Sequence, residues 1–187
     1  KAYDSAALRG IFGFRSLDLR DASISNVSAI QEALSTVSTL SLSMRQSHLK
    51  KILSAPLTLQ RLHLETTNMS VLSYLNDAPA LRALSSRFLP DTSIVSGLEH
   101  LELSRVELKN WDKIASAARL KTMSMTYCRF PNAGRMPPIY GFSNLEFMGI
   151  EFCDLSVVPH LAEAVHLSYV YLEGNDNLRD ITALTTL

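Results

Sequence analysis

Apolar residues recur in a single pattern along most of the chain. In the segment 98–108, LEHLELSRVEL, they occupy the first, fourth, sixth, ninth and eleventh positions. The same frame fits residues 59–69, 120–130 and 145–155, and degenerate copies begin near residues 14, 37, 81 and 167. There are about eight copies, most of them about 22 residues apart, and a period of this length is typical of a repeat protein.

Each copy predicts a strand, a turn and a helical segment. The apolar residues at positions four and six alternate with other residues, as in a short strand with one buried face. Beyond the eleventh position, apolar residues return at every third position, as in Trp111, Ile114 and Ala117. That spacing favours 3₁₀-like or short helical turns. Because one such coil cannot bury its apolar face alone, the coils are expected to stack into a solenoid with a parallel sheet.

The copies resemble leucine-rich repeats, L-x-x-L-x-L-x-x-N/C-x-L, and in particular the short subclass of about 22 residues. The resemblance covers the chain from Phe14 to Leu187. It implies an α/β solenoid: a curved right-handed superhelix with a parallel concave β-sheet and short helical or 3₁₀ convex segments. We expect residues 1–187 to form a single leucine-rich repeat domain that is a fragment of a longer chain.

Three copies depart from the pattern. The register slips near Gln46–Leu49, and the short copy that begins at residue 81 has Ser86 where an inward leucine belongs. The copy at residue 120 contains PNAGRMPPIYG, whose adjacent prolines exclude a regular helix. We expect a kink or bulge near residues 86–97 and an irregular loop near residues 131–142.

The two cysteines of the chain, Cys128 and Cys153, occupy the ninth position of their copies. In leucine-rich repeats this position holds Asn, Cys or Thr, and its side chain turns inward to satisfy backbone groups of the turn. Thr67 and Asn175 fill it in other copies, and Val106 fills it without a donor. The resemblance therefore implies structural thiols. A Cys128–Cys153 disulfide stays conceivable, although parallel side-chain directions and the low cysteine count argue against it.

Composition and motifs narrow the classes of function. Eighteen basic residues balance eighteen acidic ones, so no basic excess indicates nucleic acid as a partner. No apolar run reaches the ~18 residues that a membrane span requires. The five histidines lie at no metal-ligand spacing, and no nucleotide-binding or hydrolase motif occurs. We expect no enzyme activity, catalytic residue, metal or cofactor, and no small-molecule site is evident.

The outward-facing residues of the predicted strands differ between the two halves of the chain. The first half is polar: Asp18, Arg20, Asp21, Ser41, Ser43, Arg61, His63, Glu65 and Arg87. The second half concentrates aromatic residues, which anchor protein interfaces. The candidate partner-binding residues are Glu102, Arg105, Tyr127, Phe147, Glu151, Phe152, Tyr169, Tyr171 and Glu173. Two other readings stay open: Tyr127 and Phe152 could pack in the turn, or a further segment could cover these aromatic residues.

The pattern favours a non-catalytic protein-interaction module that binds a protein partner on its concave face. Three of the candidate residues are glutamates, which favour a partner surface with Lys or Arg. One alternative is the ligand-recognition ectodomain of a surface or secreted receptor or antigen, which glycans at the sequons of Asn26 or Asn68 would support. Another is a regulatory subunit or domain of a larger enzyme complex. Two unpaired cysteines, with no signal peptide and no cysteine-rich cap in this segment, favour an intracellular location.

Overall fold

The structure is a computed structural model. It describes residues 2–3, 15–20, 23–24, 30, 34–43, 46–53, 58–66, 75, 80–89, 92–109, 111, 114, 117–136 and 140–187. Asp21, Asn26, Thr67 and Asn68 lie outside these residues. The chain forms two compact units, Lys1–Leu84 and Ser85–Leu187, which are described in turn.

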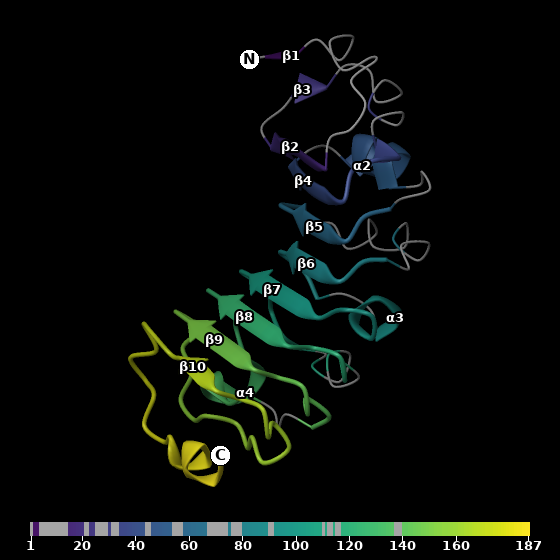
Figure 1. The fold of residues 1–187 in the computed structure, drawn as a ribbon. Coiled ribbons are helices and arrows are strands. Elements are labelled where there is room, and N and C mark those ends of the chain that lie inside the picture. The colour runs from purple at the N-terminus through teal and green to yellow at the C-terminus, as the bar shows by residue number, and fades with distance from the viewer. Residues whose placement is uncertain are drawn as a thin grey trace. The chain divides into compact units, whose positions relative to one another are not determined.

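The first unit is built on short parallel strands. Its described elements are β1 (Ala2–Tyr3), β2 (Ser16–Arg20), β3 (Ser23–Ile24), β4 (Thr39–Ser43), α2 (Gln46–Leu53) and β5 (Arg61–Leu64). Strands β2, β4 and β5 pair in chain order, so that Leu17, Leu40 and Leu62 are in register (Figure 1). The short strands β1 and β3 pair separately, also in parallel. Strand β6 (Ala83–Ser86) begins at the end of this unit and runs into the next.

The second unit repeats the same architecture. Its further elements are α3 (Thr92–Val95), β7 (His100–Ser104), β8 (Thr122–Thr126), α4 (Pro131–Gly134), β9 (Phe147–Glu151), β10 (Tyr169–Tyr171) and η4 (Thr182–Thr186). Strands β7 to β10 lie side by side in chain order (Figure 1). In each unit, the described strands of the stacked coils are parallel and follow one another in chain order, with little helix between them. The predicted solenoid of stacked coils with parallel strands is therefore confirmed.

The core lies on the inward side of the strands. The inward residues of β8 and β9 include Met123, Met125 and Met148, all of which are fully buried. Met123 is in register with Leu101 before it and with Met148 after it, so one column of apolar side chains continues from coil to coil. Each fully buried side chain of this size contributes roughly 1.5–3 kcal/mol.

The connecting segments contain the predicted 3₁₀-like turns. The amide of Ile114 donates to the carbonyl of Trp111, Ala117 donates to Ile114, and Leu120 donates to Ala117, at 2.8–3.0 Å. All four side chains are buried. Spacing by three residues therefore puts each of these apolar side chains in the core, and each turn pairs the N–H of one apolar residue with the carbonyl of the apolar residue before it.

The irregular copies keep the fold by local adjustments. Ser86 lies buried in β6, and its hydroxyl donates to the carbonyl of Phe88 at 2.7 Å, so a polar group in a leucine position is satisfied within its own turn. The register slip near residue 46 coincides with α2, whose Leu49 and Ile52 are buried. In the proline-containing copy, the helical turn α4 ends at Gly134, before Pro137 and Pro138.

A polar ladder follows the strands of the second unit, formed by the inward side chains of Cys128, Cys153 and Asn175. The Asn175 amide oxygen accepts the N–H groups of Cys153 (3.1 Å) and Leu155 (3.0 Å). Its nitrogen donates to carbonyls that include that of Ile150, at 2.7 Å. The predicted inward position of these side chains is confirmed. They supply hydrogen bonds where the chain leaves the sheet.

One coil earlier, sulfur takes the place of the amide. The Cys153 thiol accepts the N–H of Cys128 at 3.2 Å and lies 3.1 Å from the carbonyl oxygen of Glu151. Both cysteines are free thiols and are buried. The side-chain interaction with the Cys128 thiol, together with burial, raises the pKa of the Cys153 thiol. A buried thiol with a raised pKa is a poor nucleophile, which supports a structural role.

The ladder predicts that Asn175→Ala is strongly destabilising. The substitution leaves two buried N–H groups and at least one buried carbonyl without their partner, and we expect the free energy of unfolding to fall by about 2–4 kcal/mol. Urea unfolding followed by circular dichroism measures the change. Asn177→Ala is the matched control, because Asn177 is exposed and, among the described residues, its side chain donates to the side chain of Asp154 alone. Equal stability of the two variants would contradict the role of the ladder.

Burial of the thiols predicts that neither cysteine reacts in the native protein. Ellman's reagent at pH 8 is expected to release no colour from the folded chain and two equivalents after unfolding in guanidinium. Ser143→Cys places a thiol at an exposed position and serves as the positive control. Stoichiometric labelling of the folded wild-type chain would show that these thiols are accessible and would contradict the structural interpretation.

Candidate functional site

The aromatic candidate residues lie on the outward face of β7–β10 and immediately beyond its strand ends. The exposed fractions are 56% for Tyr169, 51% for Tyr127, 42% for Phe152 and 36% for Tyr171, while Phe147 is partly exposed. Large aromatic side chains are usually buried, so four with this exposure on one sheet are unusual. Tyr127 and Phe152 do lie beside the ladder, as one reading proposed, but they reach solvent.

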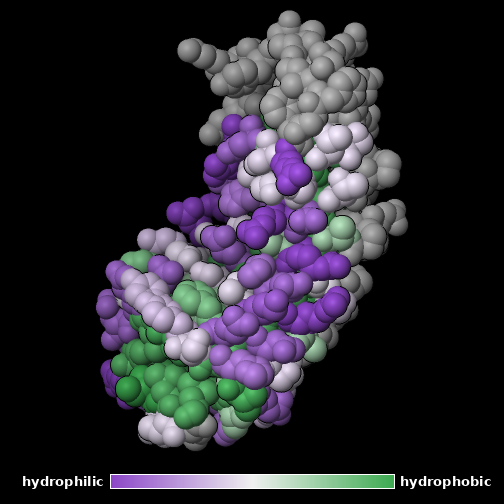
Figure 2. Space-filling view, in the orientation of Figure 1, coloured by the Kyte–Doolittle hydropathy of each residue, from purple (hydrophilic) through white to green (hydrophobic). Residues whose placement is uncertain are grey.

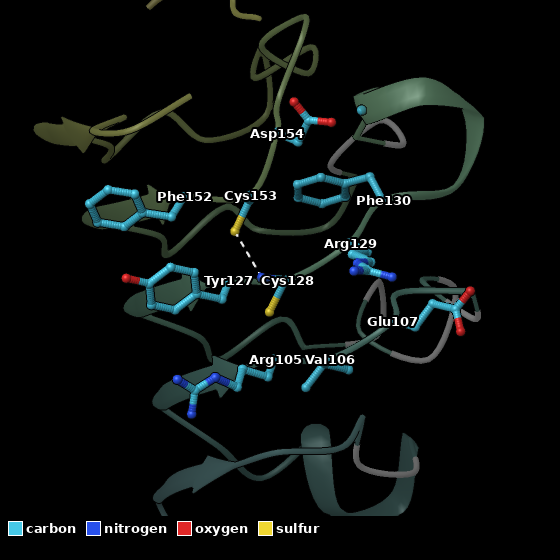
Figure 3. Close-up of a pocket in the computed structure, with 11 residues that line it drawn as sticks. Arg105, Val106, Glu107, Tyr127, Cys128, Arg129, Phe130, Phe152, Cys153 and Asp154 are labelled. Carbon is cyan, nitrogen blue, oxygen red and sulfur yellow. Dashed lines mark hydrogen bonds between the residues drawn. The ribbon is translucent and has the colours of Figure 1, made fainter. Parts of the chain in front are cut away.

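Three candidate residues form one stacked column, composed of Arg105, Tyr127 and Phe152. Each is the first residue after its strand. The rings of Tyr127 and Phe152 are nearly parallel, at 18°, with centroids 5.1 Å apart. The Arg105 guanidinium carbon lies 5.5 Å from the centroid of the Tyr127 ring. Figure 3 shows all three side chains pointing to the same side, away from the ladder cysteines.

The backbone explains why these side chains face outward together. Arg105, Tyr127 and Phe152 have φ values of 58°, 55° and 52°, a left-handed conformation that is uncommon without glycine. The N–H groups of these three residues donate to the next coil, to the carbonyls of Thr126, Glu151 and Glu173, at 2.9–3.0 Å. These bonds hold the strained turn, and the turn directs the following residue inward to the ladder.

Gly174 occupies the next position of the same column. Its φ is 67°, and a Cβ atom there would lie 2.2 Å from a carbon of the Phe152 ring. The glycine therefore allows the ring of Phe152 to lie against the backbone of the next coil. Both faces of the Tyr127–Phe152 stack are thus covered, by Arg105 at one end and by Gly174 at the other, and the ring edges remain open.

A second stacked pair lies on the strands themselves. The rings of Phe147 and Tyr169 are 5.4 Å apart and inclined by only 8°. The ring of Phe147 also passes over Gly149, at 3.2 Å from the position of a Cβ. The hydroxyl of Tyr171 donates to the carboxylate of Glu173. These contacts order the side chains of β9 and β10 before any partner binds.

The charged candidate residues surround the aromatic rings. Glu102 is exposed and Glu151 is partly exposed, and the described residues offer neither carboxylate an ion pair. Arg105 is exposed and contacts Tyr127 through its guanidinium, without a carboxylate partner in the described part of the chain. These charges are available to groups on another molecule.

Four outward residues of the first unit interact with one another. Arg20 and Asp18 form an ion pair at 2.6 Å, and Arg20 lies 4.0 Å from Glu65, which is 3.4 Å from His63. Hydrogen bonds from the side chain and backbone of Arg20 lower the pKa of the Asp18 carboxyl to about 2. These four residues pair their charges, and the stacked aromatic pairs of the described residues all lie in the second unit.

A hollow of about 830 Å³ adjoins the aromatic column. It extends over three consecutive coils, and its lining includes charged residues that the sequence pattern did not single out: Glu107, Arg129 and Asp154 (Figure 3). These residues lie beyond the ladder position, in segments that belong to no named strand. Their common offset from the strand end was the one signal in the sequence that could have identified them.

On the face that Figure 2 shows, polar residues predominate among the coloured residues of the middle coils, and apolar residues gather toward the C-terminal end. Ile181 and Leu187 are exposed there. In the described part of the chain, no cluster of three His, Cys, Asp or Glu side chains is placed to hold a metal ion. No described helix combines the length and apolarity needed to cross a membrane.

Comparison with models of known protein families gives no match, and no curated protein matches the sequence. The arrangement of residues is therefore the basis for the functional argument. It joins stacked, exposed aromatic rings, charges that have no partner among the described residues, and an adjacent hollow on one sheet.

The contact between Phe152 and Gly174 predicts that Gly174→Ala perturbs the column. A Cβ would collide with the ring and strain the backbone at positive φ, so we expect a loss of about 1–3 kcal/mol in the free energy of unfolding. Thermal unfolding measures the loss, and near-ultraviolet circular dichroism reports the displaced rings. Gly141→Ala is the control, since Gly141 also has positive φ (83°) but lies outside the column. An unchanged aromatic signal in Gly174→Ala would contradict the assigned packing.

Proposed function

We propose that the chain is a non-catalytic protein-interaction module of the leucine-rich repeat type, with the outward face of β7–β10 as its binding surface. The observation that carries the proposal is the pair of aromatic stacks, Tyr127–Phe152 and Phe147–Tyr169, which stand exposed on one sheet. Tyrosine and phenylalanine bury large areas on binding with few rotatable bonds, and such residues anchor many protein interfaces.

Rigidity is the physical basis of the proposed binding. The side chains of the column are held by stacking and by inter-coil hydrogen bonds, so less conformational entropy is lost when a partner orders the surface. The carboxylates of Glu102 and Glu151 would attract Lys or Arg of the partner and align it before the rings are buried. Glu173 is tied to Tyr171 and contributes through that pair.

The leucine-rich repeat assignment is the finer part of the proposal. It is supported by the spacing of apolar residues and by the polar ladder at the ninth position of three consecutive copies. The 3₁₀-like turns on the opposite side of the coil agree with the short subclass. The outward sheet face is also the surface through which stacked-repeat proteins commonly bind.

The proposed function predicts that Tyr169→Ala strongly weakens partner binding without unfolding the chain. The immobilised wild-type chain should retain specific proteins from an extract of its source cells, quantified by mass spectrometry. Loss of an exposed aromatic anchor is expected to reduce their retention about 30-fold. Because the Tyr169 side chain is 56% exposed, the Tyr169→Ala variant should unfold at nearly the same temperature as the wild type.

Tyr140→Ala provides the matched control, because Tyr140 is equally exposed, at 59%, but precedes β9 and lies outside both stacks. Proteins that bind this surface should be retained by the wild type and by Tyr140→Ala and lost from Tyr169→Ala. Equal retention by all three chains would refute the proposed surface, and unfolding of Tyr169→Ala would assign that residue to the core.

A further inference from the structure

In the hollow beside the aromatic column, the acidic side chains have partners, whereas the arginines have no carboxylate partner among the described residues. The lining of the hollow contains two acidic and two basic residues, Glu107, Asp154, Arg105 and Arg129. Both acidic side chains already have partners: Glu107 pairs with Lys109 at 2.9 Å, and Asp154 accepts the side-chain amide of Asn177 at 2.5 Å. The two arginines are exposed and have no carboxylate partner among the described residues.

Arg105 is also held in place for recognition. Its guanidinium lies against the face of Tyr127, whose other face is covered by Phe152. Stacking limits the rotamers of the arginine while leaving its N–H donors free, which suits a planar guanidinium that binds a carboxylate through two hydrogen bonds.

Like Arg105, the aromatic rings favour a negatively charged group on the ligand. Stacking covers the negative faces of Tyr127 and Phe152, and the positive ring edges remain exposed. A carboxylate at Arg105 would therefore meet a guanidinium and ring edges together. In Figure 3 the side chain of Arg129 points to the opposite side from Arg105, so a segment that crosses the hollow passes one cation and then the other.

We propose that this hollow binds an extended acidic segment of the partner protein. One carboxylate pairs with Arg105, the adjoining aliphatic carbons lie against the edges of Tyr127 and Phe152, and a second acidic residue lies toward Arg129. The proposal rests on the proposed interaction function and adds a chemical identity for part of the partner. Separate arginines on two coils suit two carboxylates better than one phosphate, which prefers converging arginines.

Selection from a phage-displayed library of random nine-residue peptides tests the proposal. On the immobilised wild-type chain, the enriched peptides should carry Asp or Glu at one position beside an apolar residue. The best peptide, synthesised with a fluorescent label, should bind at least tenfold more weakly when that acid is replaced by its amide. Its affinity should also fall as salt is raised, because an exposed ion pair is screened.

Variants of the chain assign the interaction to Arg105. Arg105→Gln should weaken the same peptide about tenfold or more, and Arg105→Lys should weaken it less, since it keeps the charge but loses the planar stacking. Arg119→Gln is the matched control, because Arg119 is exposed but does not line the hollow. The wild-type affinity should persist in that control, and all four chains should unfold at similar temperatures.

The outcomes separate this inference from the function on which it rests. Selection of basic or neutral peptides whose binding is lost in Tyr169→Ala would support the interaction surface and overturn the acidic segment. The acidic segment would also be overturned if the selected peptide bound Arg105→Gln as tightly as the wild type. Tighter binding of a phosphoserine peptide than of its glutamate counterpart would overturn it too. Failure to enrich any peptide would overturn the inference, while the capture experiment with Tyr169→Ala would still decide the function.

Discussion

The hydrogen bonds between consecutive coils at the ends of the strands are the constraint on which the second unit depends. There the chain leaves the sheet, and its N–H groups would be buried without partners. Asn175 accepts two of them, and the thiol of Cys153 accepts another one coil earlier. A buried donor without a partner costs about 1–3 kcal/mol, so the ninth position of these copies must hold a small side chain that can accept.

The same constraint shapes the outer surface. To turn Cys128 and Cys153 inward, the residue before each adopts positive φ and directs its side chain outward. Because the coils repeat this geometry, Tyr127 and Phe152 stand at nearly the spacing of neighbouring strands, about 4.8 Å, where flat rings stack. The aromatic column and the ladder therefore share one backbone geometry, in which consecutive residues at the strand end point to opposite sides.

The two sheet regions differ in how they satisfy their charges. In the first unit, Asp18, Arg20 and Glu65 compensate one another on the outward face. In the second unit, Glu151 and Arg105 keep their charges available beside exposed rings. A surface that combines fixed apolar anchors with unpaired charges of both signs suits a protein partner with complementary charge, since the rings supply contact area and the charges set orientation.

The sequence by itself determined the repeat, the inward residues and the ladder, because a period of about 22 residues constrains each copy through the same local spacing. It predicted that Met125 is core, that Cys153 turns inward and that Tyr169 faces out. The pairing of Tyr127 with Phe152, the contact of Arg105 with the stack and the hollow that includes Arg129 were decided by tertiary structure. Local spacing gives the side of a strand on which a residue lies, but contacts between side chains about 25 residues apart depend on the register and turn of each stacked coil.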